Sequence, residues 1–213
     1  MPEVVSPLLV LVLLLNFLML GTSRIRAIIS ASATQGVILG ILVLAVHGHL
    51  GLRELLLAGG AILLKGGVIP GMLVKAMRDV VKRRDVEPFI GYIPSLLIGA
   101  AGTGLALLFA GTLPLAPEHV GSLLVPTSLS TVLTGFVLLT TRRKAITQVV
   151  GYLVLENGVF VMGLCLLEAL PFLIETGVLL DLFVGIFVMG IIINRINREY
   201  SSIDTLQLSS LKE

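Results

Sequence analysis

Residues 4–21 read VVSPLLVLVLLLNFLMLG, an apolar run without a charged side chain. The run lacks the two-residue alternation of apolar and polar side chains that is typical of a strand in a membrane β-barrel. About 20 mostly apolar residues are enough for one α-helix to cross a bilayer. This stretch therefore predicts a membrane-spanning helix near the start of the chain.

The whole chain shares this character. Hydrophobic residues make up 56% and charged residues 13% of the 213 residues, and the mean hydropathy is +1.05. A soluble protein of this length could not bury so much apolar surface, so the composition excludes a soluble fold. In lipid the backbone must satisfy its own hydrogen bonds, which leaves helices as the regular structure for such runs. The sequence predicts an all-α, polytopic bundle of transmembrane helices.

Charged and Pro/Gly-rich breaks divide the sequence into seven apolar stretches of spanning length. We place them near residues 4–22, 27–46, 54–74, 90–111, 121–141, 146–168 and 172–194. Glycines at helix-packing spacing predict close contacts between these helices. These glycines are Gly59, Gly60, Gly66, Gly67, Gly71, Gly99 and Gly102.

Basic residues gather after the odd-numbered stretches and so predict the orientation in the membrane. They are Arg24 and Arg26, then Lys75, Arg78, Lys82, Arg83 and Arg84, then Arg142, Arg143 and Lys144, and finally Arg195 and Arg198. Such ends face the cytoplasm, so the N-terminus is expected outside and the C-terminus inside. The order of Glu3 before the first stretch and arginines after it favours a retained span over a cleaved signal. We expect a four-helix region over 1–120, a three-helix region over 121–194 and a cytoplasmic tail over 195–213.

Three ionisable residues, Lys65, Glu156 and Asp181, fall near the middle of their predicted spans. Each lies about 15 Å from either interface, and a charge stranded there costs at least about 2.5 to 3.5 kcal/mol. We therefore expect all three to face the protein interior. Burial disfavours the charged form of such groups, which lets them take up and release a proton near neutral pH. The three residues predict a proton path through the membrane.

An alternative remains open for these side chains. A buried acid can also be held permanently by a neighbouring lysine, or by hydroxyls such as Thr131 and Thr134, as a polar contact between helices. Glu168 and Glu175 lie near the outer ends of their spans, where solvation is the ordinary explanation and an exit point of a proton path is the other. Three amides within spans are expected to form hydrogen bonds between helices. They are Asn16, Gln35 and Asn157.

Neither a metal nor a cofactor site is predicted. Cys165 is the single cysteine, so the chain alone cannot hold an iron-sulfur, nickel or zinc cluster. His47 and His49 lack a nearby cysteine or carboxylate pair that would complete a coordination sphere. Nucleotide-binding and hydrolase motifs are absent from the sequence, and the basic residues serve orientation in the lipid bilayer rather than binding of nucleic acid. We expect no active site in this chain, and any redox chemistry belongs to a partner.

Two short motifs resemble a known family. The segment RRKAIT (142–147), leading into GYLVLENG (151–158), resembles the K subunit of respiratory complex I, in which a basic turn precedes a helix with a mid-membrane glutamate. Asp181, followed by Val184-Gly185 and by NRINR (194–198), is similar to the last helix and tail of that subunit. The resemblance covers about residues 121–213. It implies that Glu156 and Asp181 stand where that family has its two acidic residues.

Over its full length the chain resembles component E of the hydrogenase-4 type, with four extra spans in front and the ending DTLQLSSLKE (204–213). This resemblance implies a subunit of a complex-I-like, membrane-bound [NiFe]-hydrogenase or formate hydrogenlyase in a prokaryotic plasma (inner) membrane. The expected partners are antiporter-like subunits, the heel subunit and the peripheral hydrogenase arm. Glu156 and Asp181 would be links in its proton path, whereas Lys65 is assigned from depth alone. The alternatives are a K-like subunit of a multisubunit cation/proton antiporter, a structural scaffold and an independent solute carrier.

Overall fold

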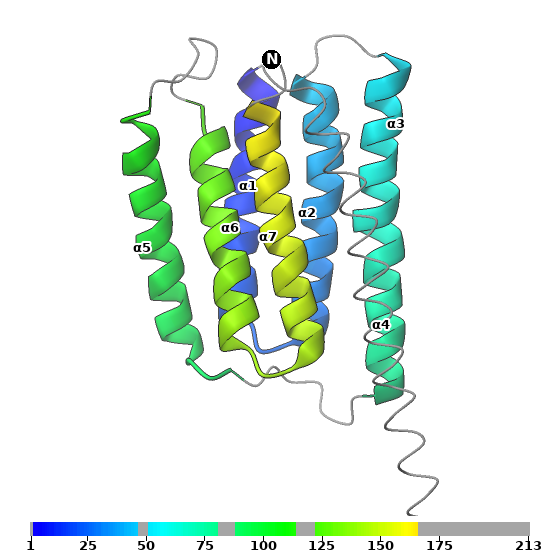
Figure 1. Ribbon diagram of the computed structural model, residues 1–213, viewed down its shortest axis with the longest axis vertical. Coiled ribbons are helices and arrows are strands. Elements are labelled where there is room, and N and C mark those ends of the chain that lie inside the picture. Colours follow the sequence, from blue (N-terminus) through cyan, green and yellow to red (C-terminus); the bar gives the residue numbers. More distant parts are fainter. Residues whose placement is uncertain (1, 47–50, 81–87, 114–121, 166–213) are drawn as a thin grey trace, which may run out of the picture.

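The chain forms a bundle of long helices that stand side by side (Figure 1). The computed structural model describes residues 2–46, 51–80, 88–113 and 122–165. The elements are α1 (Pro2–Gly21), α2 (Ile25–Val46), α3 (Leu52–Ala61), the π-helix η1 (Ile62–Val68), α4 (Ile69–Val80), α5 (Tyr92–Ala110), α6 (Leu124–Thr141) and α7 (Ala145–Cys165). Because α3, η1 and α4 follow one another without a break, they form one continuous rod.

Within the described ranges, six helices are long and apolar enough to cross a membrane. They contain Val4–Gly21, Ile25–Ala45, Ala58–Lys75, Tyr92–Ala110, Leu124–Thr141 and Ile146–Cys165. Each of the first six predicted stretches overlaps one of these spans, so the prediction of an all-α, multi-pass membrane protein is confirmed. The seventh predicted span, 172–194, and the predicted tail, 195–213, lie outside the described residues.

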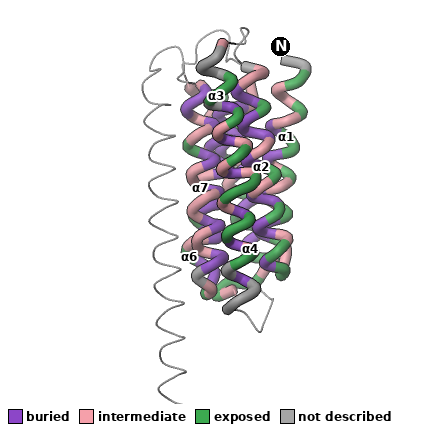
Figure 2. The backbone as a smooth tube through the Cα atoms, turned by 90° about the vertical axis from the view of Figure 1, so that its right-hand side faces the viewer, coloured by how far each residue is buried: buried purple, intermediate pink, exposed green. Residues whose placement is uncertain are grey.

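Large apolar side chains point away from the bundle. Leu14, Leu56, Leu97 and Leu108 are all more than half exposed, and exposed positions recur along the outer faces of the helices (Figure 2). The interior, in contrast, holds many hydroxyls. Those of α6 are Thr127, Ser128, Ser130, Thr131, Thr134 and Thr141. Lipid does not penalise exposed apolar side chains, whereas polar groups need partners inside the bundle, so this distribution is the one expected in a bilayer.

The apolar core is divided into two clusters along the helix axes. One cluster joins the end of α1 to the start of α2 and the first half of α7, and includes Leu20, Ile28 and Val150. The other joins the first half of α1 to the later parts of α2 and α7, and includes Leu9, Leu39 and Val161. The middle of the bundle between these clusters is therefore left to polar side chains.

The basic turns lie at one end of the bundle. The α1–α2 turn with Arg24, the end of α4 beyond Lys75 and the α6–α7 turn with Arg143 are all at the lower end of Figure 1. This shared end is the arrangement that the alternation of basic residues along the sequence predicted. The assignment of that end to the cytoplasm stays a prediction.

Arg142 has a structural role at this end that its part in the charge pattern did not indicate. Its side chain is fully buried, and it donates from Nη2 to the Leu20 carbonyl at 3.0 Å and from Nη1 to the Ile90 carbonyl at 3.3 Å. The guanidinium also lies 5.3 Å from the centre of the Tyr92 ring. Burial lowers the pKa of Arg142 and Tyr92 opposes that shift. The arginine thus ties the end of α1 to the segment before α5 and to the end of α6.

Close helix contacts occur at glycines, but mostly not at those predicted. A Cβ added at Gly158 would lie 2.6 Å from the Val132 backbone nitrogen, and one added at Gly151 would lie 2.7 Å from that of Leu139. α6 and α7 therefore touch backbone to backbone. Of the predicted glycines, an added Cβ would meet a close described neighbour at Gly66, Gly99 and Gly102. An added Cβ would meet no described neighbour within 4 Å at Gly59, Gly60, Gly67 and Gly71.

Candidate functional site

Lys65 occupies the middle of the π-helix η1, in the third span. Seven residues, Ile62–Val68, follow the wider π-helical path between α3 and α4. Such segments are rare and are found frequently at functional sites, because they rotate the side chains of a helix relative to an unbroken α-helix. The Lys65 residue is only 9% exposed. Here the π-helix accompanies a lysine that faces the protein interior in mid-span, as its depth in the sequence predicted.

Gly36 on α2 makes room for this lysine. A Cβ added at Gly36 would lie 2.6 Å from the Lys65 Cβ and 2.8 Å from the Lys65 carbonyl carbon. Real side chains do not approach so closely, so a larger residue at this position would displace the third span. Gly36 was not among the glycines expected to form close contacts, although Gly36 and Gly40 stand at the four-residue spacing of such contacts.

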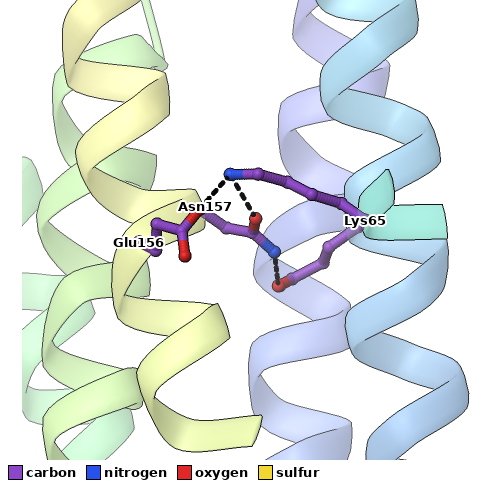
Figure 3. A network of polar contacts seen from close by, with 4 residues as sticks. Lys65, Glu156 and Asn157 are labelled. Atoms are coloured by element: carbon purple, nitrogen blue, oxygen red, sulfur yellow. Dashed lines mark hydrogen bonds and ion pairs between the residues drawn. The ribbon is translucent and has the colours of Figure 1, made fainter. Parts of the chain in front are cut away.

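Glu156 on α7 is the partner of Lys65. Lys65 Nζ lies 2.8 Å from Glu156 Oε1, and the two side chains are only 8% and 11% exposed (Figure 3). The ammonium also lies 5.1 Å from the centre of the Phe160 ring, at a distance that suits a cation–π contact. The structure thus brings together two of the three mid-membrane residues that the sequence singled out. They form a buried ion pair between the third span and α7.

A second acceptor lies beside this pair. Lys65 Nζ is 3.5 Å from Asn157 Oδ1, a long hydrogen bond compared with ordinary values of about 2.7 to 3.2 Å. The other end of the same amide donates from Nδ2 to Gln35 Oε1 on α2 at 3.4 Å. Figure 3 shows Asn157 next to Glu156, with its amide turned toward the lysine. The ion pair is therefore the start of a longer polar chain.

Hydrogen bonds continue from Gln35 into the centre of the bundle. Gln35 Nε2 donates to Asn16 Oδ1 on α1 at 2.7 Å and to the Val12 carbonyl at 3.3 Å. Asn16 Nδ2 donates to Thr131 Oγ1 on α6 at 2.9 Å, and Thr131 donates to the Thr127 carbonyl at 2.6 Å. This hydrogen-bond chain links α1, α2, η1, α6 and α7. It fills the middle layer between the two apolar clusters.

These contacts decide several of the sequence predictions. The amides Asn16, Gln35 and Asn157 are confirmed as hydrogen-bonding groups between helices, and Thr131 takes part as one of the expected hydroxyls. A single sequence placed each of them within a span but gave no signal that they join one network. The remaining predicted site residues lie outside the described part of the chain. They are Asp181, Glu168 and Glu175.

In chemical terms the site is a carboxylate and an ammonium inside a low-dielectric bundle. The contact gives each buried charge a partner of opposite sign, and a buried charge without such a partner is costly. Within the described residues, no group of three or more His, Cys, Asp and Glu side chains is placed to hold a metal ion.

Comparison with known proteins gives two relationships. The chain is 30% identical to the "Uncharacterized protein Rv0085" of Mycobacterium tuberculosis over 204 residues, which are 94% of this chain and 92% of that protein. It is 25% identical to hydrogenase-4 component E of Escherichia coli and of Shigella flexneri over 163 residues, which are 74% of this chain and 73% of those proteins. No family model matches the sequence. No solved structure matches it either.

Proposed function

The chain belongs to the family of the protein Rv0085 of Mycobacterium tuberculosis, and we propose that it is a non-catalytic membrane subunit of a complex-I-like [NiFe]-hydrogenase assembly. The similarity to hydrogenase-4 component E supports this placement. The partners would be antiporter-like membrane subunits, a heel subunit and a peripheral hydrogenase arm, in a prokaryotic plasma membrane. Within such an assembly the chain contributes buried ionisable groups to proton translocation.

One observation carries the proposal: the ion pair between Lys65 and Glu156. Nζ and Oε1 are 2.8 Å apart, and both side chains are nearly enclosed. A buried pair that served packing alone could be replaced by apolar side chains at little cost in stability, because the loss of hydration offsets much of the attraction. In the proton path we propose, Glu156 takes up and releases a proton while Lys65 balances its charge.

The path that we propose continues beyond the described residues. Asp181 is its next link, as the resemblance of residues 121–213 to the complex I K subunit implies. Glu168 and Glu175 are weaker candidates for an exit point at the outer side. Charge changes in a neighbouring subunit, driven by partner redox chemistry, would alter the protonation of Glu156 so that its proton passes toward Asp181.

Glu156→Gln tests the proposal, because glutamine keeps the shape of the side chain and does not titrate. Inside-out membrane vesicles that contain the assembled complex would be assayed for proton translocation per hydrogenase turnover. A positioned general acid or base contributes about 10²- to 10⁴-fold, so we expect at least a tenfold loss. Thr103→Val is the matched control, since it removes the buried Thr103–Ser130 hydrogen bond away from the ion pair and should leave translocation unchanged.

Two other outcomes would overturn this function in different ways. If Glu156→Gln lowers the amount of assembled complex but translocation per complex stays at the wild-type level, the pair is a packing device and the chain is a scaffold. If the affinity-purified chain carries antiporter-like subunits without nickel and iron-sulfur proteins, it belongs to a multisubunit cation/proton antiporter.

A further inference from the structure

The Lys65 ammonium faces two acceptors of different kinds. Glu156 Oε1 accepts at 2.8 Å and Asn157 Oδ1 at 3.5 Å. The first is a carboxylate, which loses its charge when it takes up a proton. The second is an amide oxygen, which stays neutral and accepting at any physiological pH. In the described state the ammonium is therefore paired with the carboxylate, with the amide just beyond ordinary hydrogen-bond distance.

Every hydrogen bond beyond Asn157 runs in the same direction. Asn157 donates to Gln35, Gln35 to Asn16, Asn16 to Thr131, and Thr131 to the Thr127 carbonyl. Each amide thus presents its oxygen toward the lysine and its nitrogen away from it. Hydrogen bonds in such a chain polarise one another, which makes Asn157 Oδ1 a better acceptor for a cation. The dipoles of the chain are aligned to stabilise positive charge at Lys65.

The hydrogen-bond chain that begins at Asn157 cannot carry a proton onward. Asparagine and glutamine amides neither gain nor lose protons under physiological conditions, and the described chain ends on a backbone carbonyl inside α6. Its side chains are almost fully buried, with Gln35 at 0%, Asn16 at 2% and Asn157 at 3% exposure. The chain therefore supplies fixed dipoles to the ion pair and no exit to either membrane face.

We propose that Asn157 is a positioning residue that receives the Lys65 ammonium each time Glu156 becomes protonated. The Glu156 carboxylate gains one proton from the path, Lys65 keeps its three, and Nζ moves from Oε1 onto Asn157 Oδ1. When Glu156 releases the proton, Nζ returns to the carboxylate. The inference rests on the proposed role of Glu156 in proton translocation and adds a neutral acceptor for the ammonium while Glu156 is protonated, since buried charged groups need hydrogen-bond partners.

The described groups around the ammonium differ in charge and in kind. Beyond Asn157, α2, α1 and α6 contribute the uncharged side chains Gln35, Asn16 and Thr131 in turn. In the described helices Lys65 and Glu156 are the charged residues at this depth. The Phe160 ring contacts the same ammonium but offers only its face. Asn157 Oδ1 is thus a neutral oxygen acceptor that already lies beside Nζ.

Infrared spectroscopy of the full-length chain in lipid vesicles tests this inference without any partner subunit. The carbonyl band of a protonated carboxylic acid, identified as the band that Glu156→Gln abolishes, reports the protonation of Glu156 as pH falls. In Asn157→Leu the ammonium loses this neutral acceptor while Glu156 is protonated, so we expect the midpoint to move to lower pH by about one unit. Asn157→Gln, which keeps an amide oxygen, should restore a midpoint close to that of the wild type.

Two further variants distinguish the loss of this acceptor from a general packing defect. Gln35→Leu leaves Asn157 in place but removes the acceptor of its amide, and it should give a smaller shift in the same direction. Thr103→Val breaks a buried hydrogen bond elsewhere and should give none.

An unchanged midpoint in folded Asn157→Leu and Gln35→Leu overturns the inference and leaves the proposed function standing. An equal shift in Thr103→Val overturns it as well. A Glu156 carboxyl that never becomes protonated over the accessible pH range overturns both proposals together, whereas absence of hydrogenase partners counts against the proposed function alone.

Discussion

Lys65 Nζ lies 2.8 Å from Glu156 Oε1, between a π-helical turn of the third span and the middle of α7. Two spans, α5 and α6, lie between these residues in the sequence. Their contact places two ionisable groups at one level of the bundle, where polar side chains divide the apolar core.

Removal of the lysine alone should destabilise the protein more than removal of both partners. Lys65→Met removes the cation that pairs with the buried Glu156 carboxylate, and breaking such a pair costs about 3 to 5 kcal/mol. The double variant Lys65→Met/Glu156→Gln removes both charges and should recover most of that loss. Thermal unfolding in detergent, followed by circular dichroism, measures both. A double variant as unstable as Lys65→Met would show that the pair is not the source of the effect.

Gly36→Ala should displace the third span from α2. The new methyl would overlap the Lys65 Cβ, with a separation of 2.6 Å, and overpacking of this kind costs about 1 to 3 kcal/mol. Gly104→Ala is the matched control, because no described atom lies within 4 Å of a Cβ there and alanine favours a helix. Unfolding temperatures of the two variants should move in opposite directions. Equal temperatures would argue against a tight α2–η1 contact.

Arg142→Lys should weaken the end of the bundle that carries the basic turns. The planar guanidinium reaches the carbonyls of Leu20 and Ile90 together, and an ammonium cannot reproduce this fork. Hydrogen bonds from charged groups are worth about 1.5 to 3 kcal/mol each, so we expect a loss of about 2 kcal/mol. Arg143→Lys is the control, because Arg143 is exposed and stacks on Phe89. A larger loss in the control would contradict the role assigned to Arg142.

Asp181→Asn tests the proposed continuation of the path. If Asp181 receives the proton of Glu156, the variant should lower proton translocation per turnover at least tenfold, which is the loss we also expect for Glu156→Gln. The same assay on Glu175→Gln should show at most a small change, because that residue is expected near the outer end of its span. Normal translocation in Asp181→Asn would remove Asp181 from the path and leave the Lys65–Glu156 pair unaffected.

The sequence predicted much of the architecture because hydropathy and charge are local signals. Residues 4–21, for example, are apolar enough to require a helix in lipid, and Arg24 and Arg26 mark one end of it. Depth within a span likewise placed Lys65 and Glu156 in the interior. These conclusions need only the position of a residue along its own helix.

Contacts between helices were less predictable, because they depend on how each helix is rotated about its axis. Gln35 was recognised as a hydrogen-bonding amide, but its position between Asn157 and Asn16 follows from the packing of three helices. The π-helix around Lys65 changes this rotation within one span, and hydropathy carries no signal for it. Arg142 was assigned to topology alone, since a buried arginine and an exposed arginine contribute equally to the charge pattern.

The glycine contacts between α6 and α7 hold one partner of the ion pair more firmly than the other. The two backbones meet at Gly151 and Gly158, where no space remains for even one methyl group, and such close packing resists sliding or turning of α7 against α6. Glu156 therefore lies on a helix that is packed tightly against its neighbour. In the proposed cycle, the movement that opens and closes the ion pair is therefore made by Lys65, through its long flexible side chain and the π-helical turn on which it lies.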